Sequence, residues 1–437
     1  MKNIIKKILP EKVLLVRHYL FAMMATIYYR HPSKKMIIIG VTGTKGKTSA
    51  TNFIWSTLTA MGFKTGIIST ANIRIGEEEM INDFHMTMPG RFAIQRFLRK
   101  MANKGCDICV VETTSEGIKQ YRHKGVLYDI MVFTNLTPEH LPSHEGSFEK
   151  YKEAKGVVFK ELSTHSKSIN REPVKKTIIA NRDSEHADYY LSFDADRKVT
   201  FALDNKADYK AENITEKEEG VSFTVQKEEY SLSIPGSFNV YNALPALAIG
   251  NLLEGKTEDI KKGLLSLKVI PGRVEEVKNK QNFKVYIDYA HEKESITQIL
   301  KTGNGIKAKN GKVIILLGAE GGGRDKSKRA AMGEISAKMA DYVVVSNVDP
   351  YEDDPTEIAE DIAVAAEKNG KKREEDLFVI EDRREGINKA LSLAQPGDVV
   401  LITGKGVEPT ITIDGKIYPW DDKKVTEEEL EKVVGEG

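Results

Sequence analysis

A glycine-rich stretch, GVTGTKGKTS, lies between an apolar run and a segment with helical spacing. Its glycines, Gly43 and Gly46, would let backbone amides turn toward an anion, and Lys47 would neutralise terminal phosphate groups. The Thr48 hydroxyl is the ligand that a P-loop offers to Mg²⁺. Val41 stands where the usual GxxxxGK[ST] pattern has its first glycine. Because strand, glycine turn and helix keep their order, the stretch still predicts a phosphate-binding loop for a nucleotide.

Polar side chains follow two later apolar runs, where predicted strands end. VVETTSEG contains Glu112, and VFTNLTPEH contains Asn135, Glu139 and His140. Ligands of an open parallel sheet bind beyond the carboxyl ends of its strands, so we expect these side chains beside the phosphate loop. Carboxylate oxygen is a ligand type that Mg²⁺ prefers. A lone histidine is usually structural, but this position favours His140 as a second metal ligand.

The elements that would position these residues form two α/β series. In the first, short apolar runs alternate with helical segments such as 50–61 and 90–103, which predicts a parallel sheet with crossover helices. Residues 197–234 alternate instead like an antiparallel patch. The second series begins near Phe283, and residues 424–437 are typical of a terminal helix.

These patterns predict an α/β protein in three parts. Residues 1–35 form an apolar helical segment. Residues 36–272 form a central P-loop ATPase-like domain that would bind a nucleotide, with a mostly parallel sheet. Residues 273–437 form a Rossmann-like C-terminal domain. The PGRVEE turn at 271–276 is the expected hinge.

The composition excludes some function classes. The 437 residues include 65 basic and 64 acidic side chains, a net charge of +1, so no overall field points to nucleic acid. The two cysteines, Cys106 and Cys109, form a CxxC pattern inside an apolar run. Without a second pair, buried thiols in a reducing cytosol are favoured over redox or metal chemistry.

The apolar run at 12–29 allows two interpretations. It lacks a signal-peptide cleavage site, and Arg17 and His18 interrupt it, so it is too short to span a bilayer. A helix packed on the following domain is favoured. With lysines on its N-terminal side, it could instead lie on the inner membrane surface of a cytoplasmic protein.

A set of motifs then points to one family. TGTKGKTS, ETTSEG, FTNLTPEH, YKEAK, GSFNVYNALPA, PGRVE, IDYAH and GKGVE follow one another in this order. Together they resemble the Mur ligase family over nearly the whole chain, and most of all the members that add the third residue of the stem peptide. The resemblance implies an ATP-dependent ligase of peptidoglycan precursors. A substrate carboxylate would take the γ-phosphate as an acyl phosphate, and an incoming amine would then expel phosphate.

The resemblance also assigns ATP binding to the central domain, 36–272, amino-acid binding to the C-terminal domain, 273–437, and roles to single residues. It implies two Mg²⁺ ions, with ligands Thr48, Glu112, His140 and Lys155, the lysine as N6-carboxylysine. Catalytic roles fall on Lys47, Glu112, His140 and Lys155. ATP contacts fall on Gly43, Thr44, Lys45, Gly46, Lys47, Thr48, Ser49, Asn135, Asn239, Asn242, Arg273 and Asp288. The peptide acceptor would contact Thr87, Ser115, Gln120 and Arg122, and the amino acid Arg324, Asp349, Tyr351, Gly404 and Glu408.

Two departures from the family pattern limit the substrate prediction. About 35 residues precede the phosphate loop, too few for the usual uridine-binding domain, so the acceptor could be lipid-linked rather than UDP-linked. Tyr351 stands where a DNPR-like motif supplies an arginine to diaminopimelate, and a buried carboxylate without a partner is costly. Lysine or a related diamino acid therefore fits better, near the acidic residues Asp349, Glu352, Asp353 and Asp354.

The sequence supports three alternatives to different degrees. A relative within the fold could act on a pseudomurein, cyanophycin or folylpolyglutamate precursor. A non-catalytic nucleotide-binding subunit could serve as a scaffold, although Lys47, Glu112, His140 and Lys155 together disfavour it. A P-loop GTPase or kinase lacks support, because no guanine-reading NKxD motif follows in place.

Overall fold

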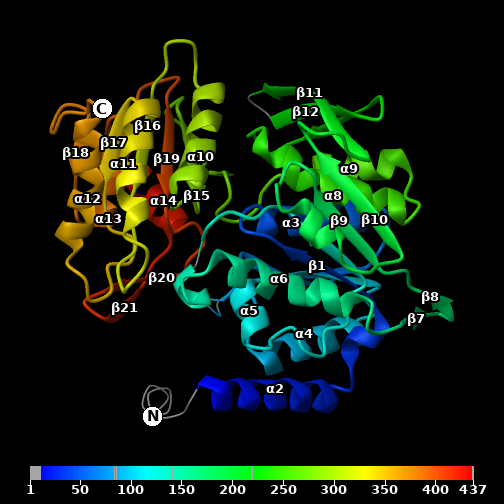
Figure 1. Cartoon of the computed structure of the whole chain (residues 1–437). Helices are drawn as coiled ribbons and strands as arrows, with labels where there is room; N and C mark the ends of the chain where they lie inside the picture. Colours follow the sequence, from blue (N-terminus) through cyan, green and yellow to red (C-terminus); the bar gives the residue numbers. More distant parts are fainter. Residues whose placement is uncertain (1–10, 83, 85, 140, 218–219, 436–437) are drawn as a thin grey trace. The chain divides into compact units, whose positions relative to one another are not determined.

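The computed structural model describes residues 11–435 except 83, 85, 140, 218 and 219. Contacts between Cα atoms divide the chain into two compact units. The first holds most of the chain before Lys268. The second holds Lys268–Gly437 with two short earlier segments, Thr215–Val221 and Ile234–Phe238. Each unit contains a sheet with helices packed on it (Figure 1), so the α/β prediction is confirmed.

Five parallel strands form the centre of the first sheet. They are β1 (Ile37–Thr42), β2 (Thr65–Ile68), β5 (Ile108–Glu112), β6 (Ile130–Phe133) and β9 (Thr177–Asn181). The order is β9-β6-β1-β5-β2, and every printed pairing among them is parallel. Almost all their side chains are buried, as expected of a sheet covered on both faces. The sequence prediction of these strands is confirmed, and β1 lies in the middle.

Helices cover both faces of this sheet (Figure 1). α3 (Lys47–Ala60), α8 (Phe238–Leu252) and α9 (Thr257–Ser266) lie on one side. α4 (Arg91–Asn103), the short α5 (Ser115–Lys119) and α6 (Phe148–Leu162) lie on the other. The α3 and α9 backbones approach closely, since the Ser56 hydroxyl donates to the Gly263 carbonyl at 2.8 Å. Cys106 and Cys109 are free thiols in this unit, and both are buried, as the apolar run predicts.

The edges of the sheet differ from the prediction. β3 (Asn72–Ile75) and β4 (Glu78–Ile81) add an antiparallel hairpin that was not predicted. At the other edge follow β10 (Arg197–Ala202), β11 (Tyr209–Lys217), β12 (Gly220–Val225) and β13 (Glu228–Leu232). The expectation of an antiparallel patch is wrong for β10, which pairs in parallel with both β9 and β11. Alternating burial reports which face a side chain lies on, and not the direction of the strand.

A single carboxylate holds the turn between β10 and β11. Asp183 accepts hydrogen bonds from the backbone amides of Leu203, Asp204 and Asn205 at 2.6, 3.1 and 2.7 Å. The Tyr241 hydroxyl donates to it as well, at 2.9 Å. These contacts arise between segments far apart in the chain, so strand periodicity could not reveal them.

The N-terminal helix α2 (Glu11–Tyr28) packs on the first unit. Its Tyr19 ring meets the ring of Tyr121 edge to face, with centroids 5.6 Å apart. Nε of Arg99, on α4, donates to the Tyr29 carbonyl just after the helix at 2.8 Å. The favoured prediction of a helix packed on the next domain is confirmed. Among the described helices, none is long and apolar enough to cross a membrane.

The second unit is a smaller parallel sheet. Its strand order is β14-β15-β19-β16-β17-β18. The strands β15 (Lys284–Asp288), β16 (Val313–Leu317), β17 (Tyr342–Val345), β18 (Leu377–Val379) and β19 (Val399–Thr403) form the second α/β series, which begins near Phe283 as predicted. The short β14 (Glu275–Glu276) pairs antiparallel at the edge. The helices are α10 (Lys293–Ile306), α11 (Ser327–Met339), α12 (Pro355–Lys368), α13 (Arg383–Ser392) and the predicted terminal helix α14 (Asp422–Gly435). A hairpin of β20 (Thr410–Ile413) and β21 (Lys416–Pro419) completes it.

Candidate active site

The glycine-rich loop joins β1 to α3, as the sequence predicts, and two of its residues must be glycine. Gly43 has a φ of 149°, and Gly46 has a φ of 77°. A Cβ on Gly43 would lie 2.0 Å from the Thr134 hydroxyl, and a Cβ on Gly46 would lie 2.2 Å from Oδ1 of Asn242. A side chain at either position would therefore force the loop away from these neighbouring residues. α3 begins at Lys47, so its free amides and dipole face the end of this loop.

Asn135 holds the loop from the end of β6. Its side-chain Oδ1 accepts from the Lys45 amide at 2.8 Å, and its Nδ2 donates to the Lys45 carbonyl at 3.2 Å. Its own carbonyl accepts from the Thr44 amide at 2.9 Å. The Thr44 hydroxyl in turn lies 3.1 Å from the Tyr151 hydroxyl. Asn135 thus positions the loop, in addition to the nucleotide contact that the sequence predicts for it.

Glu112 ends β5 beside the loop, with an exposed fraction of 1%. The Thr48 hydroxyl donates to its two carboxylate oxygens at 3.1 and 3.2 Å. Thr70, just after β2, donates from its amide at 2.8 Å and from its hydroxyl at 2.9 Å. The structure therefore brings together two predicted metal ligands. Sequence reasoning missed Thr70, although its place at the carboxyl end of a predicted parallel strand could have indicated it.

Lys155 is buried on α6 and also faces the loop. Its ammonium donates to the Gly43 carbonyl at 2.8 Å and lies 4.5 Å from the centroid of the Tyr151 ring. Burial, followed by the nearby charge of Lys47, lowers the pKa of Lys155 well below its usual value, although Glu139 and Glu112 act in the opposite direction. A lowered pKa favours the neutral amine, which is the form that can react with CO₂.

These side chains fit a nucleotide with Mg²⁺. The described residues contain no group of three or more His, Cys, Asp or Glu that could hold a metal ion alone. Thr48, Glu112 and a modified Lys155 would have to share the ions with phosphate oxygens, which is how proteins commonly hold Mg²⁺. The remaining predicted ligand, His140, lies outside the described residues. Lys47 lies folded back, with its ammonium 2.7 Å from the Thr44 carbonyl.

The predicted acceptor residues lie near the same end of the sheet. The Thr87 and Thr70 hydroxyls are 2.8 Å apart, which joins Thr87 to the Glu112 network. Ser115 lies 3.1 Å from Nε2 of His144. The two other predicted acceptor residues are neighbours, since Nη2 of Arg122 donates to Oε1 of Gln120 at 2.8 Å.

Arg122 has capacity for a further anionic partner. Its Nη1 donates to the Met88 carbonyl at 2.6 Å, but its buried Nε has no hydrogen-bond partner. Burial lowers the pKa of Arg122, and Glu116 is the nearby carboxylate that opposes this shift. A carboxylate or phosphate would satisfy the guanidinium better than the present neutral partners.

Asn239 and Asn242 belong to α8 in the first unit. The Nδ2 group of Asn242 donates to Oδ1 of Asn239 at 3.0 Å. Because Oδ1 of Asn242 lies against Gly46, this helix supports the phosphate loop from a distant part of the sequence. Ser49 lies in the first turn of α3 and is buried. Asn242 thus lies next to the loop, and Asn239 supports it from the same helix.

The predicted nucleotide contacts Arg273 and Asp288 lie together in the second unit. The Arg273 guanidinium stacks 4.6 Å from the centroid of the Tyr289 ring. Asp288, at the end of β15, accepts from the amides of Val274 and Ala290 at 2.9 and 2.8 Å. Burial raises the pKa of Asp288, opposed first by the charge of Arg273.

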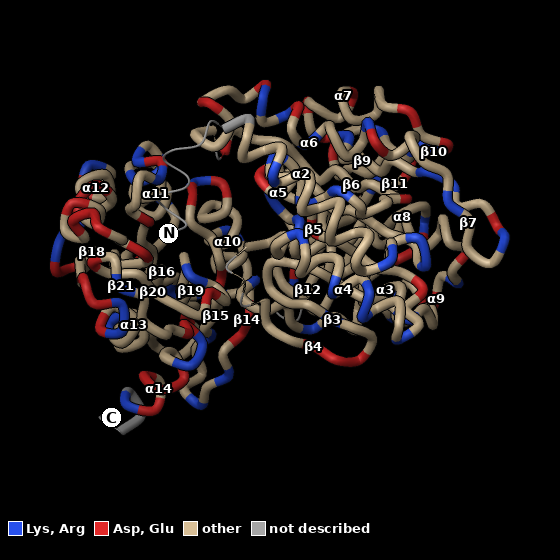
Figure 2. The backbone as a smooth tube through the Cα atoms, turned by 90° about the horizontal axis from the view of Figure 1, so that it is seen from below, with Lys and Arg blue, Asp and Glu red and all other residues tan. Residues whose placement is uncertain are grey.

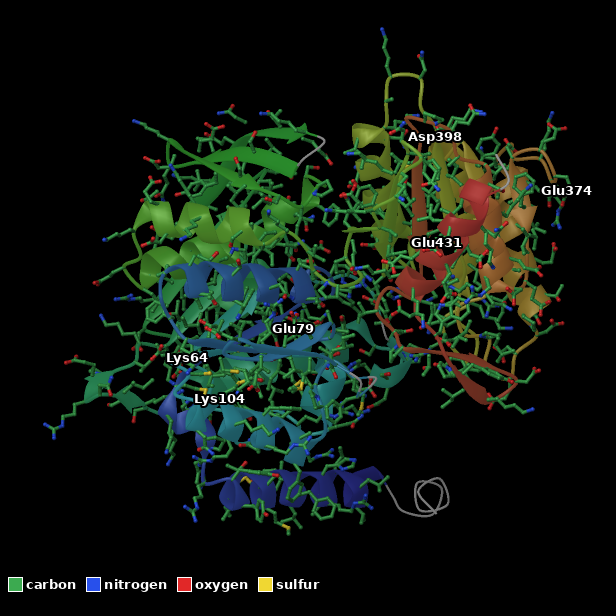
Figure 3. All side chains as sticks on the ribbon, turned by 180° about the vertical axis from the view of Figure 1, so that it is seen from behind. Lys64, Glu79, Lys104, Glu374, Asp398 and Glu431 are labelled. Carbon is green, nitrogen blue, oxygen red and sulfur yellow. The ribbon has the colours of Figure 1, made fainter. Side chains whose placement is uncertain are left out.

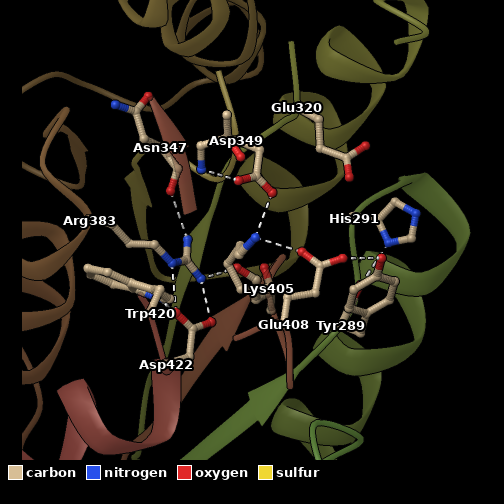
Figure 4. Close-up of polar contacts among 12 residues, drawn as sticks. Tyr289, His291, Glu320, Asn347, Asp349, Arg383, Lys405, Glu408, Trp420 and Asp422 are labelled. Carbon is tan, nitrogen blue, oxygen red and sulfur yellow. Dashed lines mark hydrogen bonds and ion pairs between the residues drawn. The ribbon is translucent and has the colours of Figure 1, made fainter. Parts of the chain in front are cut away.

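A buried lysine dominates the predicted amino-acid site (Figure 4). The Lys405 ammonium donates to Asp349 at 2.5 Å and to Glu408 at 2.6 Å. Glu408 also accepts from the Tyr289 hydroxyl at 2.9 Å. Sequence reasoning quoted GKGVE but did not assign Lys405, which is 1% exposed. Two of the predicted amino-acid contacts are therefore already paired with a cation of the protein.

The other predicted amino-acid contacts lie close by. Nε of Arg324 is 3.8 Å from Glu320, and Tyr351 has a positive φ of 56° beside Gly322. The charge of Glu320 and a hydrogen bond with Tyr351 together raise the pKa of Arg324, although burial alone would lower it. Gly404 ends β19 with a φ of 110°. The cation beside Tyr351 is thus Arg324.

The acidic residues next to Tyr351 have structural partners. Asp353 accepts from the Gly322 amide at 3.1 Å, and Asp354 caps α12 by accepting from the Thr356 amide at 2.9 Å. With Asp349 held by Lys405, the carboxylates that were expected to favour a lysine-like substrate are largely engaged within the protein.

Replacing Lys405 with methionine is expected to lower the free energy of unfolding of the second unit by about 3 kcal/mol, because Asp349 would keep a buried charge without a counter-ion. Urea unfolding can be followed by Trp420 fluorescence in a Trp55→Phe background, since Trp420 is then the one tryptophan of the chain. The exposed Lys416→Met serves as the matched control. Equal midpoints for the two variants would contradict the structural role of Lys405.

Comparison with known proteins finds relatives of both units of this chain. Residues 41–250 match the model of the Mur ligase middle domain, and residues 272–406 match that of the Mur ligase, glutamate ligase domain. A Bacillus cereus UDP-N-acetylmuramoyl-L-alanyl-D-glutamate--2,6-diaminopimelate ligase is 35% identical over 413 residues, covering 94% of this chain and 81% of the relative. A Roseiflexus UDP-N-acetylmuramyl-tripeptide synthetase is 35% identical over 413 residues, covering 92% and 80%.

A solved structure agrees with these relatives. It is titled as a UDP-N-acetylmuramoyl-L-alanyl-D-glutamate--2,6-diaminopimelate ligase, and it shares 27% sequence identity with a TM-score of 0.61. The match covers 91% of this chain and 79% of the solved one.

Proposed function

This chain belongs to the Mur ligase family of ATP-dependent, amide-forming ligases, and we propose that it adds one amino acid to a muramyl dipeptide precursor of the cell wall. The observation that carries the proposal is the convergence of Thr48, Glu112 and Lys155 on one phosphate loop. We further propose a division into a helical segment, 1–35, a central domain, 36–272, and a C-terminal domain, 273–437.

The site has the charges that the reaction needs. Bringing an acceptor carboxylate to a triphosphate opposes two anions, so cations must lie between them. The bound nucleotide would supply the phosphoryl group that activates the acceptor carboxylate. Lys47, once extended from the Thr44 carbonyl, would neutralise the terminal phosphates. Arg122 would hold an anionic group of the acceptor through its free Nε.

We propose two Mg²⁺ ions at this loop. Thr48 and Glu112 would hold one ion, since they already share the Thr48 hydroxyl hydrogen bond. Lys155, as N6-carboxylysine, and His140 would serve the second. Carboxylation replaces an ammonium, which would repel Mg²⁺, with an anionic oxygen ligand. The lowered pKa of Lys155 supports this modification, because the neutral amine is the reactive species.

We propose that the amino acid is lysine-like rather than diaminopimelate. The support is Tyr351, whose hydroxyl replaces a cation for the second carboxylate of diaminopimelate. The relatives above are named for diaminopimelate, and Arg324 lies beside Tyr351, so lysine and diaminopimelate are compared directly in the test below. We place the enzyme in the cytoplasm, with a peripheral contact at the inner membrane face through α2.

The proposal is tested by phosphate release from Mg-ATP by the purified full-length protein. We expect release only when an acceptor and an amino acid are both present, with lysine turned over at least about 10-fold faster than diaminopimelate, a difference of about 1.4 kcal/mol in transition-state stabilisation. UDP-linked and lipid-linked muramyl dipeptides are tested separately. Release that needs no amino acid would contradict the ligase, and faster turnover of diaminopimelate would contradict only the preference.

A further inference from the structure

The outer side of α2 is a row of large apolar side chains, which we call the α2 face: Val13, Val16, Leu20, Met24 and Ile27. Each is between 47% and 63% exposed, and successive members are three or four residues apart, so they share one side of the helix. Of the 17 exposed large hydrophobic side chains in the described chain, eight lie on α2. A continuous apolar strip of this kind marks an interaction surface.

The opposite side of the helix is anchored. Ala22, Ala25 and Thr26 are buried, and a Cβ on Gly125 would lie 1.8 Å from the Thr26 hydroxyl, so the helix lies close against that turn. Nε of Arg99 fixes the end of the helix through the Tyr29 carbonyl. Figure 3 shows side chains projecting from α2 away from α4, with no described segment beyond them. The apolar strip therefore faces outward because the other side is held.

The N-terminal segment that contains the α2 face is rich in positive charge. Residues 1–35 contain eight lysines and arginines and one glutamate. The whole chain has 65 basic and 64 acidic side chains, so the rest of the chain is net acidic. Arg17 lies on the same side of the helix, 5.5 Å from the centroid of the Phe21 ring. The neighbouring α4 contains three arginines and a lysine but no acidic residue (Figure 2).

Aromatic residues border the same strip. Tyr28 lies 6.5 Å from Phe92 of α4 between ring centroids, and both rings are exposed. Tyr19 and Phe21 are exposed on the same helix. Apolar side chains flanked by cations and aromatic rings are typical of helices that lie in the headgroup region of a bilayer.

We propose that the α2 face docks this enzyme on a membrane surface rich in anionic phospholipid, with the helix lying parallel to the bilayer. The charge favours lipid over a second copy of this chain, because a symmetric dimer would bring the two basic faces together. This inference specifies the peripheral contact proposed above and does not depend on the ligase chemistry. It would bring the enzyme to any acceptor that is held in the same membrane.

The test is co-sedimentation of the full-length protein with vesicles of phosphatidylcholine alone or mixed with phosphatidylglycerol. We expect binding to the anionic vesicles to be at least about 10-fold stronger, and to weaken as the Debye length falls from about 10 Å at 0.1 M salt to about 3 Å at 1 M. The double variant Leu20→Asp with Met24→Asp is expected to reduce this binding at least about 10-fold.

The matched control changes two exposed apolar residues of β21, Ile417→Asp with Tyr418→Asp, and is expected to bind vesicles like the unmodified protein. Phosphate release with a soluble acceptor should be unchanged in the α2 variant, so a failure of docking is distinguished from a failure of the ligase. Equal binding to both vesicle types, or full binding by the α2 variant, would overturn the proposal. A dimer in sedimentation velocity that the α2 variant abolishes would instead identify a second copy as the occupant.

Discussion

Lys155→Ala is expected to lower kcat at least about 100-fold, the loss that follows removal of one preorganised group at a transition-state charge. The residue is buried against the Gly43 carbonyl of the phosphate loop, so the substitution would remove the proposed metal ligand from the place where negative charge gathers. Lys155→Arg is expected to be equally inactive, because a guanidinium keeps the positive charge and does not form the carbamate. Phosphate release in single-turnover and steady-state assays measures both variants.

The modification itself has a separate readout. We expect a carbamate carbon signal in ¹³C NMR of the unmodified protein equilibrated with ¹³C-bicarbonate, and its absence in Lys155→Arg. Lys160→Ala, which lies on the exposed end of the same helix, serves as the control for effects on α6. Full activity in Lys155→Arg would rule out a carboxylated lysine as a required ligand, whatever the state of the NMR signal.

Glu112→Gln is expected to reduce kcat/KM for Mg-ATP at least about 100-fold, since a metal-ion clamp contributes several kcal/mol to a phosphoryl transition state. The amide keeps the size of the side chain and an oxygen for the Thr70 amide, so the fold should be retained. What is lost is the negative charge beside Thr48. The Mg²⁺ concentration for half-maximal rate should rise at least about 10-fold, because binding an ion to a neutral amide is weaker.

A titration of rate against Mg²⁺ at fixed ATP separates this effect from poor nucleotide binding. Glu149→Gln, at an exposed position of α6, is the matched carboxylate control. An unchanged Mg²⁺ requirement in Glu112→Gln, with activity lost, would assign Glu112 to support of Thr70 and Thr48 rather than to the metal.

Local patterns in the sequence were sufficient to predict the phosphate loop and the parallel sheets of this protein. Glycines at 43 and 46, followed by lysine and threonine, predicted the loop, because positive φ and close approach of another chain segment leave no room for a side chain. Buried apolar runs separated by helical segments predicted the parallel sheets of both units. Their carboxyl ends brought Glu112 and Asn135 to the loop, as the geometry of parallel strands requires.

The partners of charged groups were decided by tertiary structure. Nothing in GKGVE or NVDPYEDDP states that Lys405 would pair with Asp349, since these two residues meet only when β17 and β19 end at the same edge of a sheet. Thr70 lies beside Glu112 for the same reason, because Thr70 follows β2, Glu112 ends β5, and these two strands are neighbours. Pairing across distant segments depends on which strands become neighbours, and a local pattern does not contain that information.

The direction of β10 and the exposed side of α2 were also decided by tertiary structure and not by the local sequence. Alternation along a strand shows which side chains lie on each of its two faces, but it does not show the direction of the strand. The hydrogen bonds that Asp183 accepts hold the turn before β11, and Asp183 itself follows β9 in the chain. The apolar sequence of residues 12–29 predicted a helix, yet it did not tell which side would be buried. That choice was made by the fit of Thr26 against Gly125 and by Arg99 at the end of the helix, because burial of one side leaves the other exposed.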